Sequence, residues 1–537
     1  MSPPPKEGKI WAVAAVLSLP AFLLPVYNPD LFWHLSAGRW IIEHRALPRS
    51  DWLSFTSAET PWVDFEWLAQ LIFEGAYRLG GYASLWVLKG VLLLGIWFFL
   101  DKTLELHRLS TRVRAAGLVL WSAAAVMHAD IRPELFSLLL FALVLWILEG
   151  LRLGRRKVGA KEAIAAAALF AFWADLHLGF LIGLAVIALY GAAAASQGER
   201  RVLKDCGKLF AAALAGTLIN PYGAGPYQVA WQHWNQGANL ARYIAEWRPM
   251  SARNPVYWPF WLLLALTAAA SRRLALAPVL CAAVLGAAAI MHERTAPFFS
   301  IAAVPLICLA AATQRAWGRR VLAVSVAACA AFALWLSPRL YRAEFFNDKF
   351  VPRIAAEFVD RERTVFTPLR VYNPWEWGGY LGWRLAPWHR VYDDGRYIFH
   401  ERLPREAAAI ADTKEWQRFI DDERIDAMLL QNLPKYFPTT KAYPDGSAKS
   451  FDRPYYLFYA PRKTWALVHW DETALLFVRR ASVPAGWLKD HEYRYVRPRD
   501  SAAFAEAVER KEIPQAKVAE EVSRHEREAR ELARGLR

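Results

Sequence analysis

Long apolar runs recur along the first two thirds of the chain and then stop. A helix that spans a bilayer needs about 20 consecutive, mostly apolar residues. Runs of roughly that length lie at 10–27, 82–100, 113–128, 134–151, 162–175, 179–196, 208–219, 257–270, 274–291, 297–312 and 320–337. The pattern predicts a membrane domain over residues 1–337 with about eleven spans.

The remaining residues read as soluble sequence. Over 338–500, short apolar stretches alternate with helical patterns, which favours an α/β domain. The expected strands are Thr364–Phe366, Arg390–Tyr392, Ala427–Leu430, Trp465–His469 and Ala474–Val478, and the expected helices are Pro352–Asp360 and Thr413–Asp421. The tail, 501–537, is highly charged with helical spacing and is expected to form an exposed helix. The predicted fold class is therefore a polytopic α-helical membrane domain followed by a C-terminal α/β domain.

Lysine and arginine cluster in alternate loops between the apolar runs. Loops of this kind stay on the cytoplasmic side of a membrane. An odd number of spans then places the N-terminus in the cytoplasm and the C-terminal domain outside it, in the inner (cell) membrane of a bacterium. Residues 10–27 are expected to stay as an anchor, because no small-residue cleavage site follows them. The clusters are Lys6/Lys9, Lys102/Arg108/Arg112, Arg152/Arg155/Arg156/Lys157/Lys161, Arg200/Arg201/Lys204/Lys208, Arg272/Arg273 and Arg315/Arg319/Arg320.

Composition narrows the function classes. The net charge is +15 at pH 7, but much of the excess lies in these clusters, so no nucleic-acid partner is expected. The four cysteines show no CxxC spacing, which argues against a disulfide framework or a zinc site. No Gly-rich phosphate loop, Walker pattern, HExxH or GxSxG occurs. A nucleotide-sugar enzyme with a cytoplasmic Rossmann domain is therefore unsupported.

The opposite set of loops is rich in Asp, Glu, His, Arg, Asn and Trp. These loops are 28–81, 128–134, 173–179, 220–255 and 292–294. Each is explained equally well as an interfacial cap with aromatic-belt residues. Together they favour one shared cavity at the outer surface, because ionisable groups at span ends are costly when they face lipid. Within this set, Asn220-Pro-Tyr-Gly223 is typical of a turn.

The loop 28–81 carries two helical patterns. The first follows Pro29 and Asp30, with Leu31, Leu35 and Trp40 on one stripe, and the second runs through Trp62–Tyr77. Asp30 is thus expected at a helix N-terminus beside the outer end of the first span. There it either caps the helix, or projects into the cavity as a proton acceptor or a ligand for a divalent cation.

The pattern Asp30-x-x-x-His34-Leu-x-x-Gly38-Arg…Pro48-x-x-Asp51 resembles the first outer loop of GT-C class glycosyltransferases. The resemblance implies a polytopic enzyme that moves a sugar from a polyprenyl-phosphate donor with inversion, and Asp30 corresponds to the catalytic Asp of that family. Candidates for a second acidic group are Asp64, Glu66 and Asp130, between which the pattern does not choose. His34 is a candidate substrate contact, and a divalent cation (Mg²⁺ or Mn²⁺) is a candidate cofactor with Asp30 and Asp130 as ligands.

A lipid phosphate leaving group needs positive charge nearby. Arg132, His177 and Arg294 are basic residues at the outer ends of spans. Arg132 is the leading phosphate contact, because an Arg-Pro pair at a span start fixes the guanidinium at the bilayer surface; the alternative is that it reaches to lipid headgroups. Glu246-Trp247 is expected at the rim of an acceptor site.

One segment of the C-terminal region stands out for its aromatic and acidic residues. Tyr372-Asn-Pro-Trp375-Glu376-Trp377-Gly-Gly-Tyr380, followed by Tyr392-Asp-Asp394-Gly-Arg396, resembles the Trp-Trp-Asp-Tyr-Gly element of oligosaccharyltransferase catalytic subunits. Here Trp377 takes the third position and Glu376 stands one residue early, so glycosylation of an Asn sequon is not predicted. Trp375, Glu376, Trp377, Asp394 and Arg396 are candidate substrate-binding residues, since aromatic rings beside a carboxylate suit sugars. The alternative is a Gly-Gly turn over packed Trp residues.

These observations favour a membrane glycosyltransferase that uses a polyprenyl-linked sugar and an unidentified acceptor. Two other classes stay open. One is a transporter, although transporters carry their ionisable residues near mid-membrane and here they cluster at outer ends. The other is a non-catalytic cell-envelope protein that binds polysaccharide or lipid.

Overall fold

The computed structural model describes residues 5–271, 274–313, 315–340 and 345–535. The chain forms two compact units. The first comprises residues 1–28, 37–47 and 63–347, and the second comprises 29–36, 48–62 and 348–537. Two pieces of the loop 28–81 therefore cluster with the C-terminal residues.

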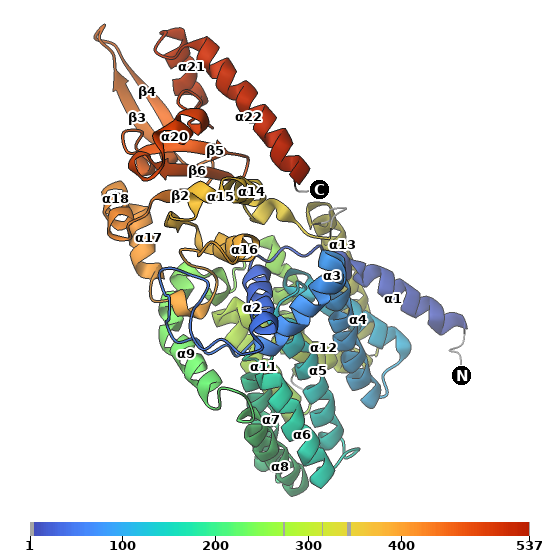
Figure 1. Cartoon of the computed structure of the whole chain (residues 1–537). Helices are drawn as coiled ribbons and strands as arrows, with labels where there is room; N and C mark the ends of the chain where they lie inside the picture. Colours follow the sequence, from blue (N-terminus) through green and yellow to red (C-terminus); the bar gives the residue numbers. More distant parts are fainter. Residues whose placement is uncertain (1–4, 272–273, 314, 341–344, 536–537) are drawn as a thin grey trace. The chain divides into compact units, whose positions relative to one another are not determined.

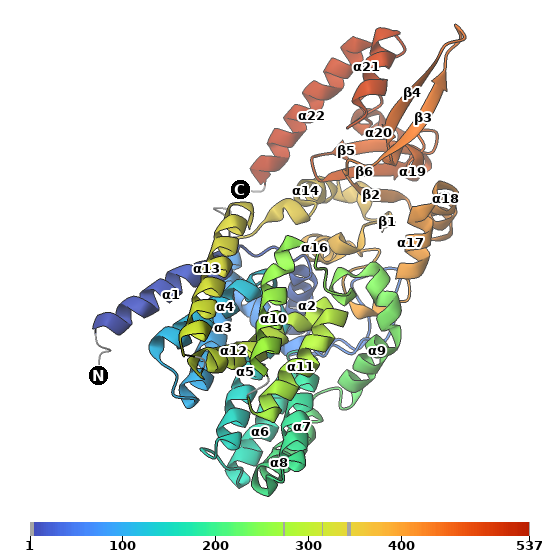
Figure 2. The same cartoon turned by 180° about the vertical axis from the view of Figure 1, so that it is seen from behind.

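The first unit is helical (Figures 1 and 2). Its helices are α1 Pro5–Leu23, α2 Leu31–His44, α3 Trp67–Leu106, α4 Thr111–Ala125, α5 Pro133–Arg152, α6 Ala160–Ala174, α7 Phe180–Ser196, α8 Arg200–Thr217, α9 Gly225–Tyr243, α10 Trp258–Ala270, α11 Leu276–Met291, α12 Ala296–Thr313 and α13 Arg315–Leu340. The first residues of α2 belong to the second unit. Short 3-10 helices accompany them at η1 Val126–His128, η2 Ala245–Trp247, η3 Pro255–Tyr257 and η5 Glu293–Thr295.

Each of the eleven predicted apolar runs coincides with a helix. Four helices in the described part of the chain are long and apolar enough to cross a membrane, at Trp67–Leu106, Pro133–Arg152, Glu293–Thr313 and Gly318–Leu336. Three shorter apolar helices lie at Phe180–Ser196, Pro255–Ala270 and Leu276–Met291. The chain is therefore an integral membrane protein, and the count of eleven spans stays a prediction.

Helix α3 contains the second predicted loop helix and the span that follows it. The helix begins at Trp67 rather than Trp62. It is interrupted at Gly80 (φ −169°, ψ 30°) and Gly81 (φ 60°, ψ −142°). A left-handed residue breaks the helical path, and glycine is the residue that adopts it without strain. The Gly-Gly pair thus separates the amphipathic first part from the apolar second part.

Helix α9 was not predicted, because its residues 225–243 have low hydropathy. It is amphipathic, with Val229 and Leu240 buried. Trp231 and Trp234 are 65% and 79% exposed. Tryptophans on the outer face of an amphipathic helix are typical of a membrane–water interface.

The second unit is built on a four-stranded sheet. Its strand order is β1-β2-β6-β5, with β1 parallel to β2 and the other pairs antiparallel. The strands are β1 Val371–Tyr372, β2 Ala427–Gln431, β5 Trp465–Trp470 and β6 Ala474–Arg479, and a separate hairpin joins β3 Tyr436–Ala442 to β4 Ala448–Pro454. The helices are α14 Arg353–Arg361, α15 Arg363–Phe366, α16 Trp375–Leu385, α17 Leu403–Ala411, α18 Thr413–Asp422, α19 Tyr456–Tyr459, α20 Ala485–His491, α21 Ser501–Glu509 and α22 Gln515–Gly535, with 3-10 turns η6 Asp348–Phe350, η7 Tyr397–Phe399 and η8 Arg480–Ser482.

Three of the five predicted strands are present, as β2, β5 and β6, and the two predicted helices are α14 and α18. Two strand predictions are wrong. Residues 364–366 lie in the short helix α15. Val391 pairs with the loop strand around Ser54 instead of joining the sheet, because its N–H donates to the Leu53 carbonyl and its carbonyl accepts the Phe55 N–H, both at 3.0 Å. Three-residue windows carry too little periodicity to reveal such pairings.

The charged tail is helical, as predicted, but it consists of the two helices α21 and α22 (Figure 1). The core of the second unit gathers the apolar faces of the sheet and α18, with Trp416, Met428, Trp465 and Leu475 buried together. Phe55 from the loop packs against this cluster. The loop is thus part of the hydrophobic core of the second unit.

Candidate active site

In the second unit, Asp30 stands immediately before helix α2. The Asp30 backbone carbonyl accepts the His34 N–H at 3.4 Å, which begins the helix. The side chain is half-buried. It lies against Gly395, where an added Cβ would be 2.4 Å from Asp30 Oδ1 and 3.1 Å from Trp33 Nε1. Only glycine leaves room for the carboxylate and the indole at this point.

The Trp33 indole is the second notable group beside Asp30. Its Nε1 is buried and has no hydrogen-bond partner among the described residues. A buried donor left unsatisfied costs free energy, and a ligand that accepts from this N–H would remove that cost. His34 is buried, with its ring 3.6 Å from the Trp33 ring; it supports the indole by packing.

Helix α16 carries the aromatic segment and packs against the backbone beside Asp30. The segment 375–380 is helical rather than a Gly-Gly turn. At Gly379, an added Cβ would lie 3.1 Å from Trp33 N and 3.3 Å from the Pro29 carbonyl. The two glycines of the segment therefore serve close backbone packing, Gly379 toward the Asp30 loop and Gly378 toward Asp393.

The candidate substrate contacts on α16 differ in exposure. Trp375 is half-buried and stacks on His400, with ring centroids 6.0 Å apart. Glu376 is exposed and Trp377 is buried. Trp375 and Glu376 are thus accessible to a ligand, whereas Trp377 packs in the interior.

Asp394 and Arg396 belong to a buried charged triad with Asp51. The three side chains are 0%, 2% and 1% exposed for Asp394, Arg396 and Asp51. Arg396 Nη2 donates to Asp51 Oδ1 at 2.6 Å and to Asp394 Oδ2 at 2.7 Å. Asp51 also accepts the Leu53 N–H at 3.1 Å, and the Arg396 guanidinium lies 4.8 Å from the Trp62 ring centroid. The triad fixes the loop 48–62 and the Asp394–Arg396 turn that carries Gly395, and the substrate-binding role of Asp394 and Arg396 stays a prediction.

Asp51 and Gly395 are site residues that the sequence did not single out. Asp51 appeared only as the last position of the loop pattern, and nothing marked Gly395 beyond its place between Asp394 and Arg396. A charge pattern alone gives no sign that an Asp and an Arg 345 residues apart are partners.

Replacing Gly378 by alanine is expected to destabilise the second unit. The new Cβ would lie 1.7 Å from the Asp393 carbonyl oxygen, so backbone must move, at a cost of about 1–3 kcal/mol or more. Gly486 in α20 has nothing within 4 Å, so Gly486→Ala is the matched control and should be neutral or slightly stabilising. Thermal melting of both purified variants measures the difference. Equal melting temperatures would show that the close approach is absent.

Asp393, next to Asp394 of the triad, and Glu406 form a second pair of buried acidic residues. Tyr372 OH donates to Glu406 Oε1 at 2.6 Å. Burial raises the pKa of Asp393 well above its usual value, and the nearby Glu406 and Asp394 raise it further. Burial also raises the pKa of Glu406, and its hydrogen bonds from Tyr372 and Asp393 oppose that shift. Asp393 is therefore protonated in the folded protein at pH values where an exposed carboxyl is ionised.

The raised pKa of Asp393 predicts that the thermal stability of the protein depends on pH. Because the folded-state pKa of Asp393 is raised, its stabilising contribution is fully present below the unfolded pKa and is lost as pH rises through the folded pKa. The melting temperature of the wild type should therefore fall as the pH rises above the ordinary carboxyl pKa of about 4. Asp393→Asn, with an amide that stays neutral, should flatten this slope. The exposed-carboxylate control Asp490→Asn should keep it, and an unchanged slope in Asp393→Asn would refute the assignment.

In the first unit, the basic residues predicted at outer span ends converge on Glu246. Arg132 forms an ion pair with Glu246, with one Nη2–Oε2 distance of 3.3 Å. Although burial acts to raise the pKa of Glu246, the Arg132 and Arg294 cations lower it to about 2. Arg294 also lies 4.8 Å from the Trp247 ring centroid. The arrangement is a half-buried group of two guanidiniums near one carboxylate, and Arg132 forms the ion pair with it.

His177 lies in the same electrostatic environment but is uncharged. Burial and the Arg294 cation lower the pKa of His177 to about 3. Its Nδ1 is 2.9 Å from the Ser137 hydroxyl and accepts the Gly179 N–H at 3.1 Å. A neutral imidazole adds no positive charge for a phosphate, so the predicted phosphate contact depends on the guanidiniums.

Asp130 anchors the chain just before the Asp30 loop. Its Oδ2 accepts the Tyr27 and Asn28 N–H groups at 3.1 and 2.7 Å, and its Oδ1 accepts the Ile131 N–H at 2.7 Å. Its oxygens are thus engaged by backbone. Among the described residues, no group of three or more His, Cys, Asp or Glu side chains is arranged to hold a metal ion. The roles of Asp30 and Asp130 as metal ligands stay a prediction.

The remaining acidic candidates lie at the start of α3. Asp64 is buried and its Oδ1 accepts from Gln70 Nε2 at 2.6 Å. Glu66 is half-buried and precedes α3, where its carbonyl accepts the Gln70 N–H at 3.0 Å. Both residues thus contact Gln70 in the first turn of α3 and stabilise the start of that helix.

Comparisons with known proteins agree with the fold. No protein-family model matches the sequence, and no curated protein is detectably similar to it. The crystal structure of the Archaeoglobus fulgidus oligosaccharyltransferase in its apo form aligns with 84% of this chain and 74% of that chain, with a TM-score of 0.50 and 10% identity. Two structures of ArnT from Cupriavidus metallidurans also align. The apo state covers 88% of this chain and 98% of that chain (TM-score 0.46, 12% identity), and the state bound to undecaprenyl phosphate covers 87% and 97% (TM-score 0.44, 14% identity).

At 10% identity, the oligosaccharyltransferase alignment establishes a shared fold. It confirms, at the level of fold, the GT-C resemblance predicted from the loop after the first apolar run.

Proposed function

We propose that this protein is an integral membrane glycosyltransferase that transfers a sugar from a polyprenyl-phosphate donor to an extracytoplasmic acceptor. The observation that carries the proposal is the position of Asp30: a half-buried carboxylate at the start of α2, beside an unsatisfied indole N–H and a glycine that leaves room for both, in a chain with the fold of an oligosaccharyltransferase. Fold alone does not define function, and Asp30 supplies the chemistry.

The proposed reaction is a single displacement with inversion. Asp30 takes the proton from an acceptor hydroxyl, whose oxygen bonds to the anomeric carbon of the sugar. The bond from that carbon to the phosphate oxygen breaks, and the polyprenyl phosphate leaves with the electron pair. The negative charge of the leaving phosphate needs cations to offset it, and Arg132 and Arg294 stay the predicted phosphate contacts. Trp375 and Glu376 contact the acceptor through ring stacking and hydroxyl hydrogen bonds.

The proposal also includes the membrane, the orientation and the cofactor that the sequence predicts. The protein lies in the inner membrane of a bacterium, with the N-terminus in the cytoplasm and the second unit outside. Mg²⁺ or Mn²⁺ is the candidate cofactor, as a partner of Asp30. Removal of divalent cations with a chelator, followed by re-addition, tests that part independently of the transfer itself.

Donor turnover tests the proposal. The purified chain in proteoliposomes is incubated with a panel of polyprenyl phosphates that carry radiolabelled hexose, aminopentose or N-acetylhexosamine, with a cell-envelope extract as the acceptor source. We expect release of free polyprenyl phosphate and transfer of label with at least one donor. Label that crosses the membrane or stays bound, with no release of polyprenyl phosphate from any donor, would instead favour a transporter or a binding protein.

A further inference from the structure

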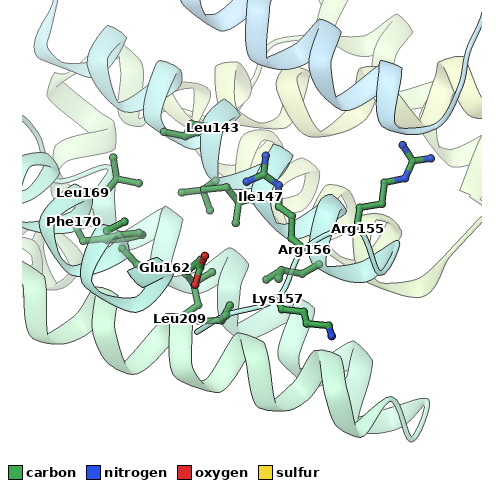
Figure 3. Close-up of a pocket in the computed structure, with 14 residues that line it drawn as sticks. Leu143, Ile147, Arg155, Arg156, Lys157, Glu162, Leu169, Phe170 and Leu209 are labelled. Atoms are coloured by element: carbon green, nitrogen blue, oxygen red, sulfur yellow. The ribbon is translucent and has the colours of Figure 1, made fainter. Parts of the chain in front are cut away.

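A large pocket opens in the first unit between helices α5, α6 and α8. It has a volume of about 530 Å³, within the range of ligand sites. Its walls are mostly apolar, and Figure 3 shows Leu143, Leu169 and Phe170 at one end.

Three cations gather at the other end of this pocket. Arg155, Arg156 and Lys157 come from the segment between α5 and α6 (Figure 3). Arg155 and Lys157 are exposed. The Arg156 guanidinium lies 3.8 Å from the Trp146 ring centroid. None of the three forms an ion pair with a carboxylate in the described ranges of the chain.

One carboxylate lines the pocket, and it is already engaged. Glu162 accepts the Gly159 N–H at 2.9 Å and caps the start of α6. Glu162 offsets one of the three cations, so the pocket lining keeps an excess of two positive charges. The pocket therefore joins an apolar interior to a positively charged mouth.

The mouth is held in place by backbone contacts. The Arg155 and Arg156 N–H groups donate to the Gly150 carbonyl at 2.9 and 3.1 Å. From α8, Arg201 Nη2 donates to the Leu151 carbonyl at 3.0 Å and Lys208 Nζ to the Val158 carbonyl at 3.1 Å. The cations thus extend from a fixed turn, which lowers the entropy cost of binding.

We propose that this pocket binds an anionic phospholipid, with an acyl chain among the apolar residues and its phosphate against Arg155, Arg156 and Lys157. Charge complementarity selects this occupant. The pocket belongs to an integral membrane protein, and its cations lie in a loop that the positive-inside pattern places on the cytoplasmic side. Basic pockets between membrane helices on that side bind the head groups of anionic lipids.

Native mass spectrometry of the full chain in an uncharged detergent tests the proposal. The probes are phosphatidylglycerol, phosphatidylcholine with the same acyl chains, and glycerol phosphate, which lacks the chains. We expect phosphatidylglycerol to be retained preferentially and glycerol phosphate not to bind. Arg155→Gln with Lys157→Gln should weaken phosphatidylglycerol binding by roughly fivefold for each charge removed.

The matched control removes two exposed cations outside the pocket, Lys161→Gln with Lys204→Gln, and should leave binding unchanged. Leu169→Trp, which fills the apolar end, should weaken binding of the lipid without altering surface charge. Equal retention of the two lipids, equal effects of the two double variants, or binding of glycerol phosphate as tight as that of the lipid would each overturn the proposal. Because Arg155 and Lys157 are exposed, their replacement is expected to leave the fold intact.

Discussion

Replacing Asp30 by asparagine is expected to lower the rate of sugar transfer by about 10²- to 10⁴-fold, the contribution typical of a positioned general base. The amide has nearly the size of the carboxylate and is as good a residue at the position before a helix. It fits beside Gly395 as the carboxylate does, but it does not accept the proton of the acceptor. The change therefore separates catalysis from helix capping.

The measurement is the release of polyprenyl phosphate per mole of purified protein in proteoliposomes. Glu43→Gln is the matched control, since Glu43 is an exposed carboxylate on the same helix. Its activity should equal that of the wild type. Full activity in Asp30→Asn with unchanged expression would show that Asp30 only supports the helix, and would remove the basis of the proposed mechanism.

The second large effect is expected on stability. Arg396→Met would leave Asp51 and Asp394 buried at 1% and 0% exposure without their cation. Removing one partner of a buried ion pair costs about 3–5 kcal/mol, because the remaining charge is unpaired. The second unit of this variant should melt well below the wild type. Circular dichroism of the purified full chain during heating measures the shift.

The chain offers an internal control for this effect. Arg405 forms ion pairs with Asp422 and Glu423, but its side chain is 56% exposed. Arg405→Met should cost no more than about 1 kcal/mol, as exposed pairs do. Adding Asp51→Asn and Asp394→Asn to Arg396→Met should recover part of the lost stability, since neutral amides need no cation. A shift no larger for Arg396→Met than for Arg405→Met would contradict the triad.

Local patterns predicted most of the helices. Each of the eleven apolar runs lies on a helix, because length and hydropathy are properties of a continuous segment. The helix after Asp30 was found for the same reason. The break in α3 at Gly80–Gly81 separates the predicted loop helix from the predicted span. Helix α9 was missed because its residues 225–243 have low hydropathy.

The sequence by itself determined the apolar helices and the α/β character of the C-terminal region, since both depend on neighbouring residues. It also made Asp30 the leading candidate carboxylate, which stays a prediction. Only the tertiary structure decided that Arg396 pairs with Asp51, that Gly395 makes room for Asp30, and that Arg132 meets Glu246. Those partners lie far apart along the chain, and any of its 65 basic residues offers the same charge to a given carboxylate. Folding brings particular pairs within hydrogen-bond distance, and burial then determines how much each pair contributes.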